Sequence, residues 1–542
     1  MGSLYFGDNL FVLREEIKSE SVDLVYLDPP FNSKRDYNLL FKTPTGHDSD
    51  AQIAAFDDSW HWGEQAEREF AELLHQENTD VAEMIQSLRR FLNESDMMAY
   101  LVMMANRLVE LHRVLKSTGS LYLHCDPTAS HYLKIVLDAI FGLQNFRNEI
   151  IWKRQSAHSD AKTKFSDVAD IILFYAKSKE TKFIPQYAEY DPDYVQKFYR
   201  FDDKDNRGLY QLADMASPNP RPNMMYEWMG FPFPAKGWRY QRETMQKLHD
   251  EGRVWYPRKS DGDFDFSKRP RLKRYLNEQE GSIVTNIWID IQSLHDVSDE
   301  RLGYPTQKPL SLLERIIQAS SNEGDTVLDP FCGCGTAVHA AQTLKREWIG
   351  IDITHLAISL IEKRMKDAFP NISFEVHGTP TDLGGAKNLS ERDKYQFQWW
   401  ACSLVNAQPF QGKKKGSDGG IDGLIFFQDD NSGAKKIIVS VKGGEHVSVT
   451  MLKDLIATVQ KEKAEIGIFI TLAEPTKPMI TEAVSAGYYQ SPKGDIPKIQ
   501  ILTIEDLLSG KAKPQYFDMS AGSHSFKKAK IEEQRAEQRK LL

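Results

Sequence analysis

One short segment brings together residue types that could bind a flat heterocycle carrying an amino group. Val22 to Leu27 is an apolar run typical of a buried strand, and Asp28-Pro29-Pro30-Phe31 follows it directly. Prolines lack an amide donor but keep their carbonyls, so this segment offers several hydrogen-bond acceptors and no competing donors. The ring of Phe31 would add a stacking surface. The segment therefore predicts a pocket that accepts hydrogen bonds from an amine.

A second segment, far downstream, combines residue types that could hold a nucleotide-like cofactor. Val327-Leu328-Asp329 indicates the end of a strand, and the turn Phe331-Cys332-Gly333-Cys334-Gly335-Thr336 leads into a helical stretch. Glycines permit a tight turn, and helix N-terminal amides can bind an anionic group. The next strand ends at Asp352, where a carboxylate can accept from both hydroxyls of a ribose. The turn alone could be purely structural, and Asp352 is what favours a cofactor site.

Both segments require strands of a parallel sheet, because ligands bind where such strands end. Residues 1–185 alternate strand-like runs with helical stretches, and this α/β order returns in 301–376. Residues 186–300 are rich in proline, aromatic and charged residues without a regular period, which indicates a recognition region built on loops. A polar insertion at about 46–96 is expected to be helical.

A third unit is predicted at 393–511, after a polar, glycine-rich linker at 377–392. It opens with apolar residues at helical spacing and continues with strand-like runs at 421–427, 436–442, 466–471 and 499–503. The tail at 512–542 is polar and is expected to end in a charged helix.

Composition restricts the class of protein. No apolar stretch approaches the roughly 20 residues that span a bilayer. The N-terminus has no basic region before an apolar core, so no signal peptide is expected. The four cysteines make no metal-ligand spacing, which favours a reduced cytoplasm. The net charge of −9 argues against a protein coated with nucleic acid but is compatible with a local basic groove.

Several segments together resemble the amino-group DNA methyltransferases. Asp28-Pro29-Pro30-Phe31 resembles their catalytic motif, and Asp329 to Thr336 resembles their S-adenosylmethionine motif. The catalytic motif comes first, which is the order of the β group of these enzymes. The resemblance covers roughly residues 1–375 and implies a Rossmann-like fold in permuted order. Further segments that resemble the group are Gly119 to Asp126, Arg147 to Trp152 and Tyr304 to Pro309.

The resemblance implies roles for the catalytic motif. A base flipped out of duplex DNA would stack on Phe31, and Asp28 and the Pro29 carbonyl, beside Pro30, would accept hydrogen bonds from its exocyclic amine. The amine would then attack the sulfonium methyl without a covalent enzyme intermediate. Family motifs that begin with Asp mostly methylate adenine N6, whereas those that begin with Ser favour cytosine N4. We therefore expect N6-adenine, with N4-cytosine as the alternative.

The resemblance also implies which residues bind the cofactor. Asp8 would contact the adenine of the cofactor, or it would only cap the helix that follows. Lys308 would approach the cofactor carboxylate, or it would remain a solvated lysine. The other implied contacts are Asp329, Phe331, Gly333, Gly335 and Thr336 for the methionine part and Asp352 for the ribose.

The loop-rich region would recognise the target sequence. Arg221, Arg239, Arg242 and Arg253 could read guanine or contact phosphate, although each could also be an ordinary surface arginine. The expected partner is double-stranded DNA, with no membrane contact, and a homodimer stays open because enzymes of this group often dimerise.

The third unit resembles the Mrr-like branch of the PD-(D/E)xK restriction nucleases. Asp422 matches the acid that holds Mg²⁺, and Lys442 matches the lysine that stabilises charge or orients water. Ser440 stands where that family carries Glu, Asp or Gln, and serine is a poor Mg²⁺ ligand. Both an active nuclease and a DNA-binding or degenerate module therefore stay open.

The sequence is compatible with three functions. The first is site-specific adenine methylation within a restriction-modification system. The second is a bifunctional, Mg²⁺-dependent restriction endonuclease whose methylation protects its own site. The third is an RNA or protein methyltransferase, since Asp-Pro-Pro-aromatic motifs occur there too.

Overall fold

A computed structural model divides the chain into two compact units. The first comprises Met1–Ile184 and Asn286–Leu542, and the second comprises Pro185–Thr285. No helix among the described residues is long and apolar enough to cross a membrane. The structure describes residues 2–30, 36–42, 48–57, 60–76, 78–155, 163, 165–295, 298, 300–302, 304, 306–410, 420–431, 433–520, 522, 525 and 528–532, with backbone alone at 36–42 and 48–57.

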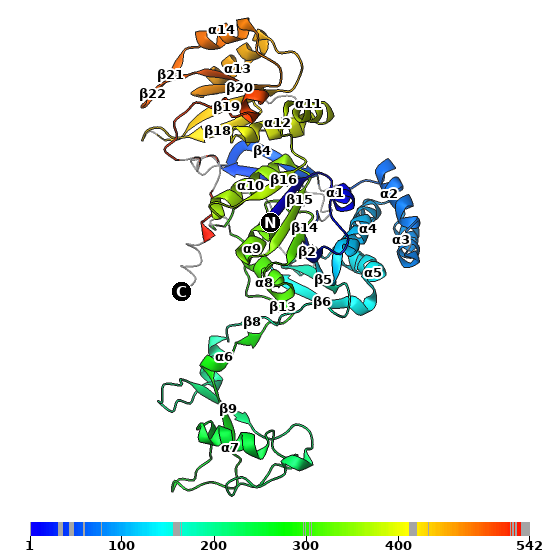
Figure 1. The fold of residues 1–542 in the computed structure, drawn as a ribbon, viewed down its shortest axis with the longest axis vertical. Helices are drawn as coiled ribbons and strands as arrows, with labels where there is room; N and C mark the ends of the chain where they lie inside the picture. The colour runs from blue at the N-terminus through cyan, green and yellow to red at the C-terminus, as the bar shows by residue number, and fades with distance from the viewer. Residues whose placement is uncertain are drawn as a thin grey trace. The chain divides into compact units, whose positions relative to one another are not determined.

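A mixed sheet forms the centre of the first unit and has nine strands among the described residues (Figure 1). Neighbouring strands run parallel except at β7, which is antiparallel to both β5 and β6. In spatial order the strands are β13 (Ile287–Trp288), β6 (Phe146–Lys153), β7 (Ala169–Ala176), β5 (Leu115–Cys125), β2 (Val22–Leu27), β14 (Thr326–Asp329), β15 (Glu347–Asp352), β1 (Gly2–Phe6) and β16 (Phe374–His377).

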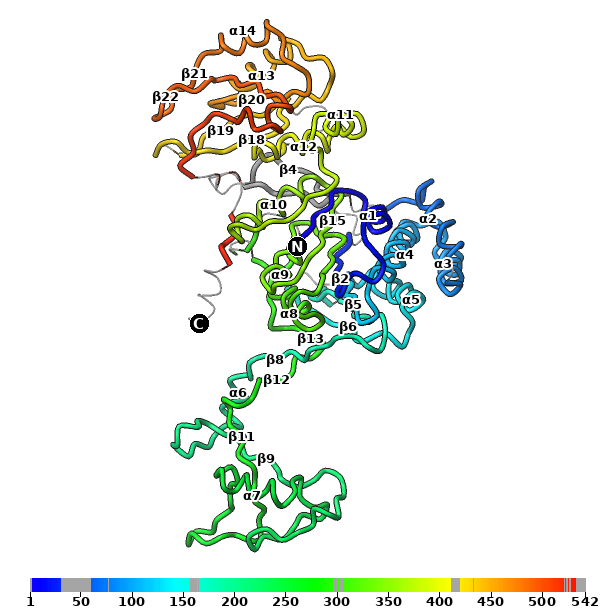
Figure 2. The backbone as a smooth tube through the Cα atoms, viewed as in Figure 1, coloured from blue at the N-terminus to red at the C-terminus, as the bar shows by residue number. Residues whose placement is uncertain are grey.

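Strands β2 and β14 are neighbours in this sheet although they are far apart in sequence (Figure 2). Leu24 of β2 lies opposite Val327 of β14, and β14 pairs in turn with β15. All three strands are parallel, so their carboxyl ends meet at one edge of the sheet. This edge holds Asp28, Asp329 and Asp352.

Helices cover both faces of the sheet. α4 (Asp96–Val114) and α5 (Ser130–Phe141) pack on the face to which Leu121 and Leu123 of β5 point, beside the short α1 (Asn9–Glu15). Tyr122 lies between these leucines, so it points to the other face. There its hydroxyl shares a hydrogen bond of 2.7 Å with Ser320 of α8 (Leu310–Ser320). α9 (Thr336–Thr343) packs against α8, and α10 (His355–Ala368) packs on β1 and β15.

The insertion that we expected to be helical begins with the second strand of a β-hairpin. β3 (Asp36–Lys42) pairs antiparallel with β4 (Asp48–Asp57), and only then follow α2 (Glu64–Leu74) and α3 (Thr79–Leu92). The prediction was wrong for the residues of β4. Their backbone groups bond to a strand that precedes the insertion, and a local sequence pattern does not reveal such a partner.

A second sheet lies in the C-terminal part of the first unit. Its strands, in spatial order, are β17 (Gln408–Pro409), β18 (Gly423–Phe427), β19 (Lys435–Lys442), β20 (Ile466–Thr471) and β23 (Ile499–Thr503). Its other elements are α12 (Lys394–Leu404), α13 (Val449–Lys461), α14 (Lys477–Ser485), α15 (Ile504–Leu508), β21 (Tyr488–Ser491) and β22 (Gly494–Pro497).

The segment expected to be a linker contains a helix, α11 (Leu383–Arg392). Asp382 caps it by accepting a hydrogen bond of 2.7 Å from the Gly385 amide, which satisfies one of the free donors at the helix start. The two glycines that suggested a flexible linker lie in the first turn of this helix. The end of the tail, at 533–542, lies outside the described residues.

The second unit is small and rich in loops. Its buried aromatic and apolar residues include Trp228, Trp238 and Met245. Its elements are β8 (Tyr187–Ala188), α6 (Pro192–Phe198), β9 (Tyr210–Asp214), α7 (Arg242–Asp250), β10 (Val254–Trp255), β11 (Arg271–Tyr275), β12 (Ser282–Ile283) and the 3₁₀ turns Pro222–Met224 and Leu276–Glu278; a further turn, Leu143–Asn145, lies in the first unit.

A buried carboxylate joins the central strands at the edge opposite their carboxyl ends. Asp23 of β2 is 2% exposed and contacts Lys116 Nζ at 2.6 Å and Lys182 Nζ at 3.1 Å. The amide of Thr326, at the start of β14, also donates to Asp23 at 3.0 Å. Burial alone would raise the pKa of Asp23, but these hydrogen bonds outweigh it and hold the pKa below its ordinary value.

We expect Asp23→Asn to lower the free energy of unfolding at pH 7 by roughly 2 kcal/mol, because both lysines lose their buried partner but are themselves partly solvated. The pKa of Asp23 is lowered by folding, so its stabilisation is present at neutral pH and is lost as the pH falls through that pKa. Urea denaturation at pH 7 and in acid would measure both effects.

The matched control is Glu83→Gln, which changes an exposed acid on α3. Equal stability of the Asp23 and Glu83 variants at pH 7 would contradict the prediction.

Candidate active site

A cavity of about 300 Å³ opens at the carboxyl edge of β2, β14 and β15. Its walls come from segments that are distant in sequence, because these strands end side by side. Of the residues that the sequence singled out, its lining includes Asp8, Asp28, Pro30, Lys308, Asp329, Phe331, Gly333, Thr336 and Asp352. Pro29 and Gly335 lie outside its lining, and Phe31 lies outside the described residues.

Asp28, directly after β2, forms an ion pair with Lys308. The distance from Lys308 Nζ to Asp28 Oδ2 is 2.5 Å. The other oxygen, Asp28 Oδ1, is buried and has no hydrogen-bond partner within the described part of the chain. A buried acceptor without a donor costs free energy, so an arriving donor would be bound strongly. Asp28 thus presents one oxygen held by the protein and one oxygen ready for a ligand.

The ion pair gives Lys308 a contact that we did not expect. Of the two expectations, a solvated lysine does not agree with a side chain that is 10% exposed and contacts Asp28, whereas an approach to a cofactor carboxylate stays a prediction. The position follows from the segment before α8, which brings Lys308 over the end of β2. Lys308 neutralises Asp28 and fixes the direction of its carboxylate.

The loop after β14 is shaped by hydrogen bonds to two carboxylates. Asp329 accepts from the Phe331 amide at 3.1 Å, and Asp352 Oδ2 accepts from the Gly333 amide at 2.9 Å. Asp352 Oδ1 accepts from both the amide and the hydroxyl of Thr354 at 2.9 Å. Burial raises the pKa of Asp352 to about 6 and raises that of Asp329 well above its usual value.

The two glycines of this loop have different neighbours and different structural roles. Gly333 has φ +49°, and a Cβ there would lie 3.2 Å from the ring of Tyr304, beside the cavity. Gly335 has φ +74°, and a Cβ there would lie 2.8 Å from Ile361 of α10. Gly335 therefore allows α9 to begin close against α10, and it lies outside the cavity lining.

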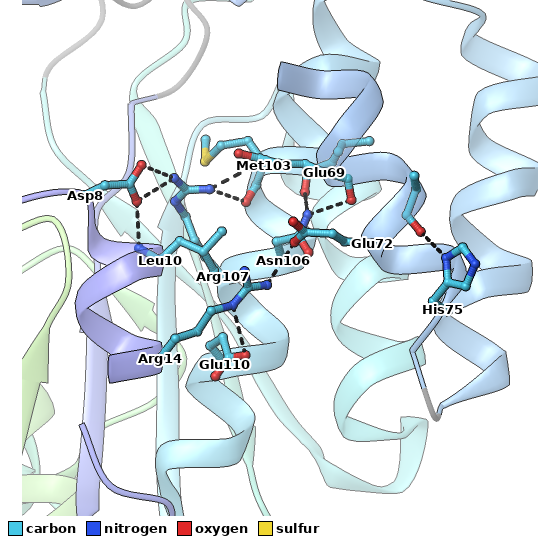
Figure 3. A network of polar contacts seen from close by, with 12 residues as sticks. Asp8, Leu10, Arg14, Glu69, Glu72, His75, Met103, Asn106, Arg107 and Glu110 are labelled. Atoms are coloured by element: carbon cyan, nitrogen blue, oxygen red, sulfur yellow. Dashed lines mark hydrogen bonds and ion pairs between the residues drawn. The ribbon is translucent and has the colours of Figure 1, made fainter. Parts of the chain in front are cut away.

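Asp8 is both a helix cap and a cavity residue. It accepts from the Leu10 amide at 2.8 Å and forms an ion pair with Arg107 at 3.1 Å (Figure 3). Arg107 also donates to Asn9 Oδ1 at 2.6 Å, and Asn9 donates to the Pro330 carbonyl at 2.8 Å. This chain of contacts ties α4 and α1 to the loop after β14.

Sequence reasoning missed several residues that line the cavity. Ile353 follows Asp352 and is 57% exposed, so it offers an apolar surface beside the carboxylate. The sequence did contain a signal for Ile353, because it is an apolar residue that directly follows an acid at the end of a strand. Arg107 and Trp60 also line the cavity. They belong to helical and polar stretches with no local sign of chemistry, and only the tertiary fold brings them there.

The C-terminal sheet brings Asp422 and Lys442 together but surrounds the acid with donors. Asp422 Oδ1 accepts from Gln398 at 2.9 Å, and Asp422 Oδ2 accepts from the Val441 amide at 2.6 Å and from Ser440 at 3.3 Å. Lys442 Nζ lies 3.8 Å from the same oxygen. Within the described part of the chain, no group of three or more His, Cys, Asp or Glu residues could hold a metal ion.

The arginines expected to contact nucleic acid differ in their surroundings. Arg253 donates to both oxygens of Glu278 at 2.7 and 2.6 Å, so its side chain is engaged within its own unit. Arg242 lies over the ring of Tyr226 at 4.8 Å. Arg221 and Arg239 are exposed and donate to backbone carbonyls.

Comparison with known proteins identifies two matched regions. Residues 22–363 match the family model described as DNA methylase, and residues 404–509 match the model described as NACHT-associated inactive Restriction Endonuclease 1. The first match covers more than half of the chain.

Two relatives and one solved structure illustrate the similarity. The type II methyltransferase M.EcaI of Enterobacter cloacae is 30% identical over 67% of this chain and 69% of its own length. The DNA adenine methyltransferase YhdJ of Escherichia coli is 23% identical over 72% of this chain and 91% of its own length. A putative DNA modification methylase of Thermus thermophilus, complexed with S-adenosyl-L-methionine, aligns over 69% of this chain and 98% of its own, with 16% identity and a TM-score of 0.34.

A further relative is longer than the region it shares with this chain. The chain spans 50% of the Mod subunit of the type III restriction-modification enzyme StyLTI of Salmonella typhimurium, at 26% identity over 63% of this chain. The family match over residues 22–363 and the similarity to M.EcaI together establish the assignment. The chain therefore belongs to the DNA methylase family and is a DNA methyltransferase.

Proposed function

We propose that this chain transfers the methyl group of S-adenosylmethionine to the N6 amine of an adenine flipped out of duplex DNA. The observation that carries the proposal is the Asp28 oxygen that has no donor among the described residues and is buried in the cavity formed together with the loop after β14. An exocyclic amine is a donor of the kind that this oxygen lacks. Relatives named as adenine methyltransferase and as a type III Mod subunit support adenine over the alternative, cytosine N4.

The residues around the cavity fit S-adenosylmethionine. The cavity volume of about 300 Å³ is at the lower end of the range for small-molecule sites. Gly333 leaves room that a side chain would fill, and Ile353 offers an apolar surface next to Asp352. Asp352 would accept from a ribose hydroxyl through Oδ2, which has a second lone pair beyond its contact with the Gly333 amide.

The chemistry divides between the methyl donor and the protein. When bound, S-adenosylmethionine supplies an electrophilic methyl: the nitrogen–carbon bond forms as the carbon–sulfur bond breaks, and the electron pair leaves with sulfur. The protein orients the amine through Asp28 Oδ1 while Lys308 holds Asp28 Oδ2. Placing the nitrogen in line with the methyl and excluding water account for most of the acceleration in such a site.

The C-terminal domain is proposed to bind DNA without cutting it. Its resemblance to the Mrr-like nucleases rests on Asp422 and Lys442, but these residues do not fit Mg²⁺. Both oxygens of Asp422 already accept hydrogen bonds from the protein, and Ser440 adds no carboxylate. The match to an inactive restriction endonuclease model agrees with this proposal. The chain would then be the modification component of a restriction-modification system, as the name of the StyLTI Mod subunit suggests.

We expect Asp28→Asn to lower the single-turnover rate of methyl transfer by about 10²-fold or more, because the amide replaces one acceptor oxygen with a donor. Affinity for duplex DNA should change little. Transfer of tritiated methyl to DNA measures the rate, and filter binding measures the affinity.

Asp126→Asn is the matched control, since Asp126 follows the neighbouring strand β5 and lies outside the cavity lining. Wild-type activity in the Asp28 variant would sink the proposed mechanism.

Asp352→Asn should weaken binding of S-adenosylmethionine by about 10- to 100-fold, because an amide nitrogen cannot accept from the ribose. Burial raises the pKa of Asp352 to about 6, so the wild-type dissociation constant should increase as the pH falls through that value. Equilibrium dialysis at pH 5 and pH 8 tests this expectation. A dissociation constant that is unchanged by both the substitution and the pH would remove Asp352 from the cofactor site.

The purified chain should not cleave unmethylated duplex DNA with Mg²⁺ or Mn²⁺, because Asp422 has no oxygen without a protein donor. Lys442→Ala should leave methyl transfer unchanged and weaken DNA binding by a few fold, through the loss of one charge. Metal-dependent cleavage that disappears in Lys442→Ala would reverse this conclusion and favour a bifunctional restriction endonuclease.

A further inference from the structure

A line of polar side chains crosses the sheet beneath the cavity and is not used by the mechanism above. The Tyr26 hydroxyl lies 3.1 Å from His124 Nδ1, and His124 Nε2 lies 3.1 Å from Asp170 Oδ2. Asp170 Oδ1 forms an ion pair with Arg154 at 2.9 Å. Tyr26, His124 and Asp170 are 2%, 0% and 4% exposed, so three polar groups are buried at a considerable cost unless they satisfy one another.

Strand pairing explains how these residues meet. Tyr26 of β2 lies opposite Tyr122 of β5, and His124 follows Tyr122 by two residues, so all three side chains share one face. His124 in turn lies opposite Ile172 of β7, which places Asp170 diagonally next to it. The line therefore runs from β2 through β5 to β7.

This line begins at the cavity. Tyr26 is one of the residues that line it, and Tyr26 precedes Asp28 by two residues on the same strand. Its neighbour Tyr122 is equally buried but bonds to Ser320 and does not line the cavity. The two tyrosines therefore differ in their surroundings: Tyr26 lines the cavity, whereas the Tyr122 hydroxyl bonds to Ser320 away from the cavity.

The directions of the hydrogen bonds follow from the charge of Asp170. Burial alone would raise the pKa of Asp170, but the contact with His124 and the charges of Lys308 and Arg154 outweigh it and lower the pKa. Asp170 is therefore a carboxylate at neutral pH and accepts from His124 Nε2–H. In that tautomer His124 Nδ1 has the lone pair, so the Tyr26 hydroxyl donates to it and turns its oxygen lone pairs away from His124.

We propose that Tyr26, backed by His124 and Asp170, accepts the proton that the target amine loses on methylation. This inference rests on the proposed function. Once its nitrogen carries the new methyl group, the amine is cationic and must release one N–H proton. That N–H bond breaks as an O–H bond forms on Tyr26; the original Tyr26 proton moves to His124 Nδ1, and Asp170 stabilises the imidazolium.

The alternative acceptor, Asp28, is less suited to this step. Lys308, which is 9% exposed, contacts Asp28 at 2.5 Å, and protonation of Asp28 would remove the negative charge from that contact. His124 instead gains its charge beside an existing carboxylate, and Arg154, whose side chain is 40% exposed, leads from Asp170 toward solvent. The arrangement follows the logic of a nucleophile, a histidine and an acid acting as one unit.

The test compares two phenylalanine substitutions in the full-length chain. Tyr26→Phe should lower the single-turnover rate of methyl transfer by about 10²-fold and abolish the solvent deuterium isotope effect on that rate, with the affinities for S-adenosylmethionine and DNA unchanged. Tyr122→Phe removes an equally buried hydroxyl away from the cavity and should retain the wild-type rate. A double variant, Tyr26→Phe with His124→Gln, should be no slower than Tyr26→Phe alone, since the unit is already broken.

A Tyr26→Phe enzyme as fast as Tyr122→Phe, or a double variant whose loss is the product of the two single losses, would overturn the inference. These results are distinguishable from failure of the proposed function. A wild-type chain that transfers no methyl to DNA overturns the function and this inference together, whereas an active wild type with an unimpaired Tyr26→Phe overturns the inference alone.

Discussion

The parallel pairing of β2 with β14 is the constraint on which the site depends. It aligns Leu24 with Val327 and Val25 with Leu328, and it brings the residues after both strands to one edge. Neighbouring parallel strands expose their carboxyl ends together, so an acid after each strand necessarily faces a shared space. At the opposite edge, Asp23 bonds to the Thr326 amide at the start of β14 and to lysines from two other segments. Strands β2 and β14 are thus joined by side-chain contacts near their amino ends, and the cavity opens at their carboxyl ends.

Several carboxylates line the cavity, and each of them has different hydrogen-bond and charge partners. Lys308 neutralises Asp28, and backbone amides of the cofactor loop donate to Asp329 and Asp352. Burial nevertheless raises the pKa values of Asp329 and Asp352, because the amides only partly replace water. Asp28 has one buried oxygen without a donor among the described residues, and the proposed binding role of Asp28 rests on this asymmetry.

In the C-terminal sheet, by contrast with Asp28, both oxygens of an acid next to a strand accept hydrogen bonds from the protein. Gln398, Ser440 and the Val441 amide together occupy both oxygens of Asp422. A carboxylate held by three protein donors in this way stabilises its surroundings, and a metal ion would compete with those donors. Ser440, at the position where the sequence resemblance to the Mrr-like nucleases led us to note a missing acid, is one of these donors.

Local patterns in the sequence predicted that this chain is a DNA methyltransferase. Acceptors and an aromatic residue after an apolar run, and a glycine turn followed by a strand-ending acid, are local patterns that depend only on strand ends and backbone freedom. The tertiary structure was needed to show that Lys308 pairs with Asp28, that Gly335 packs against Ile361, and that β4 is a strand. It also decided that Tyr26, His124 and Asp170 form one line, since these residues come from three strands whose order in the sheet is not written in any local pattern. The chemical type of a residue can be read directly from the sequence. Its contact partner in the fold depends on long-range strand pairing, which no single segment reveals.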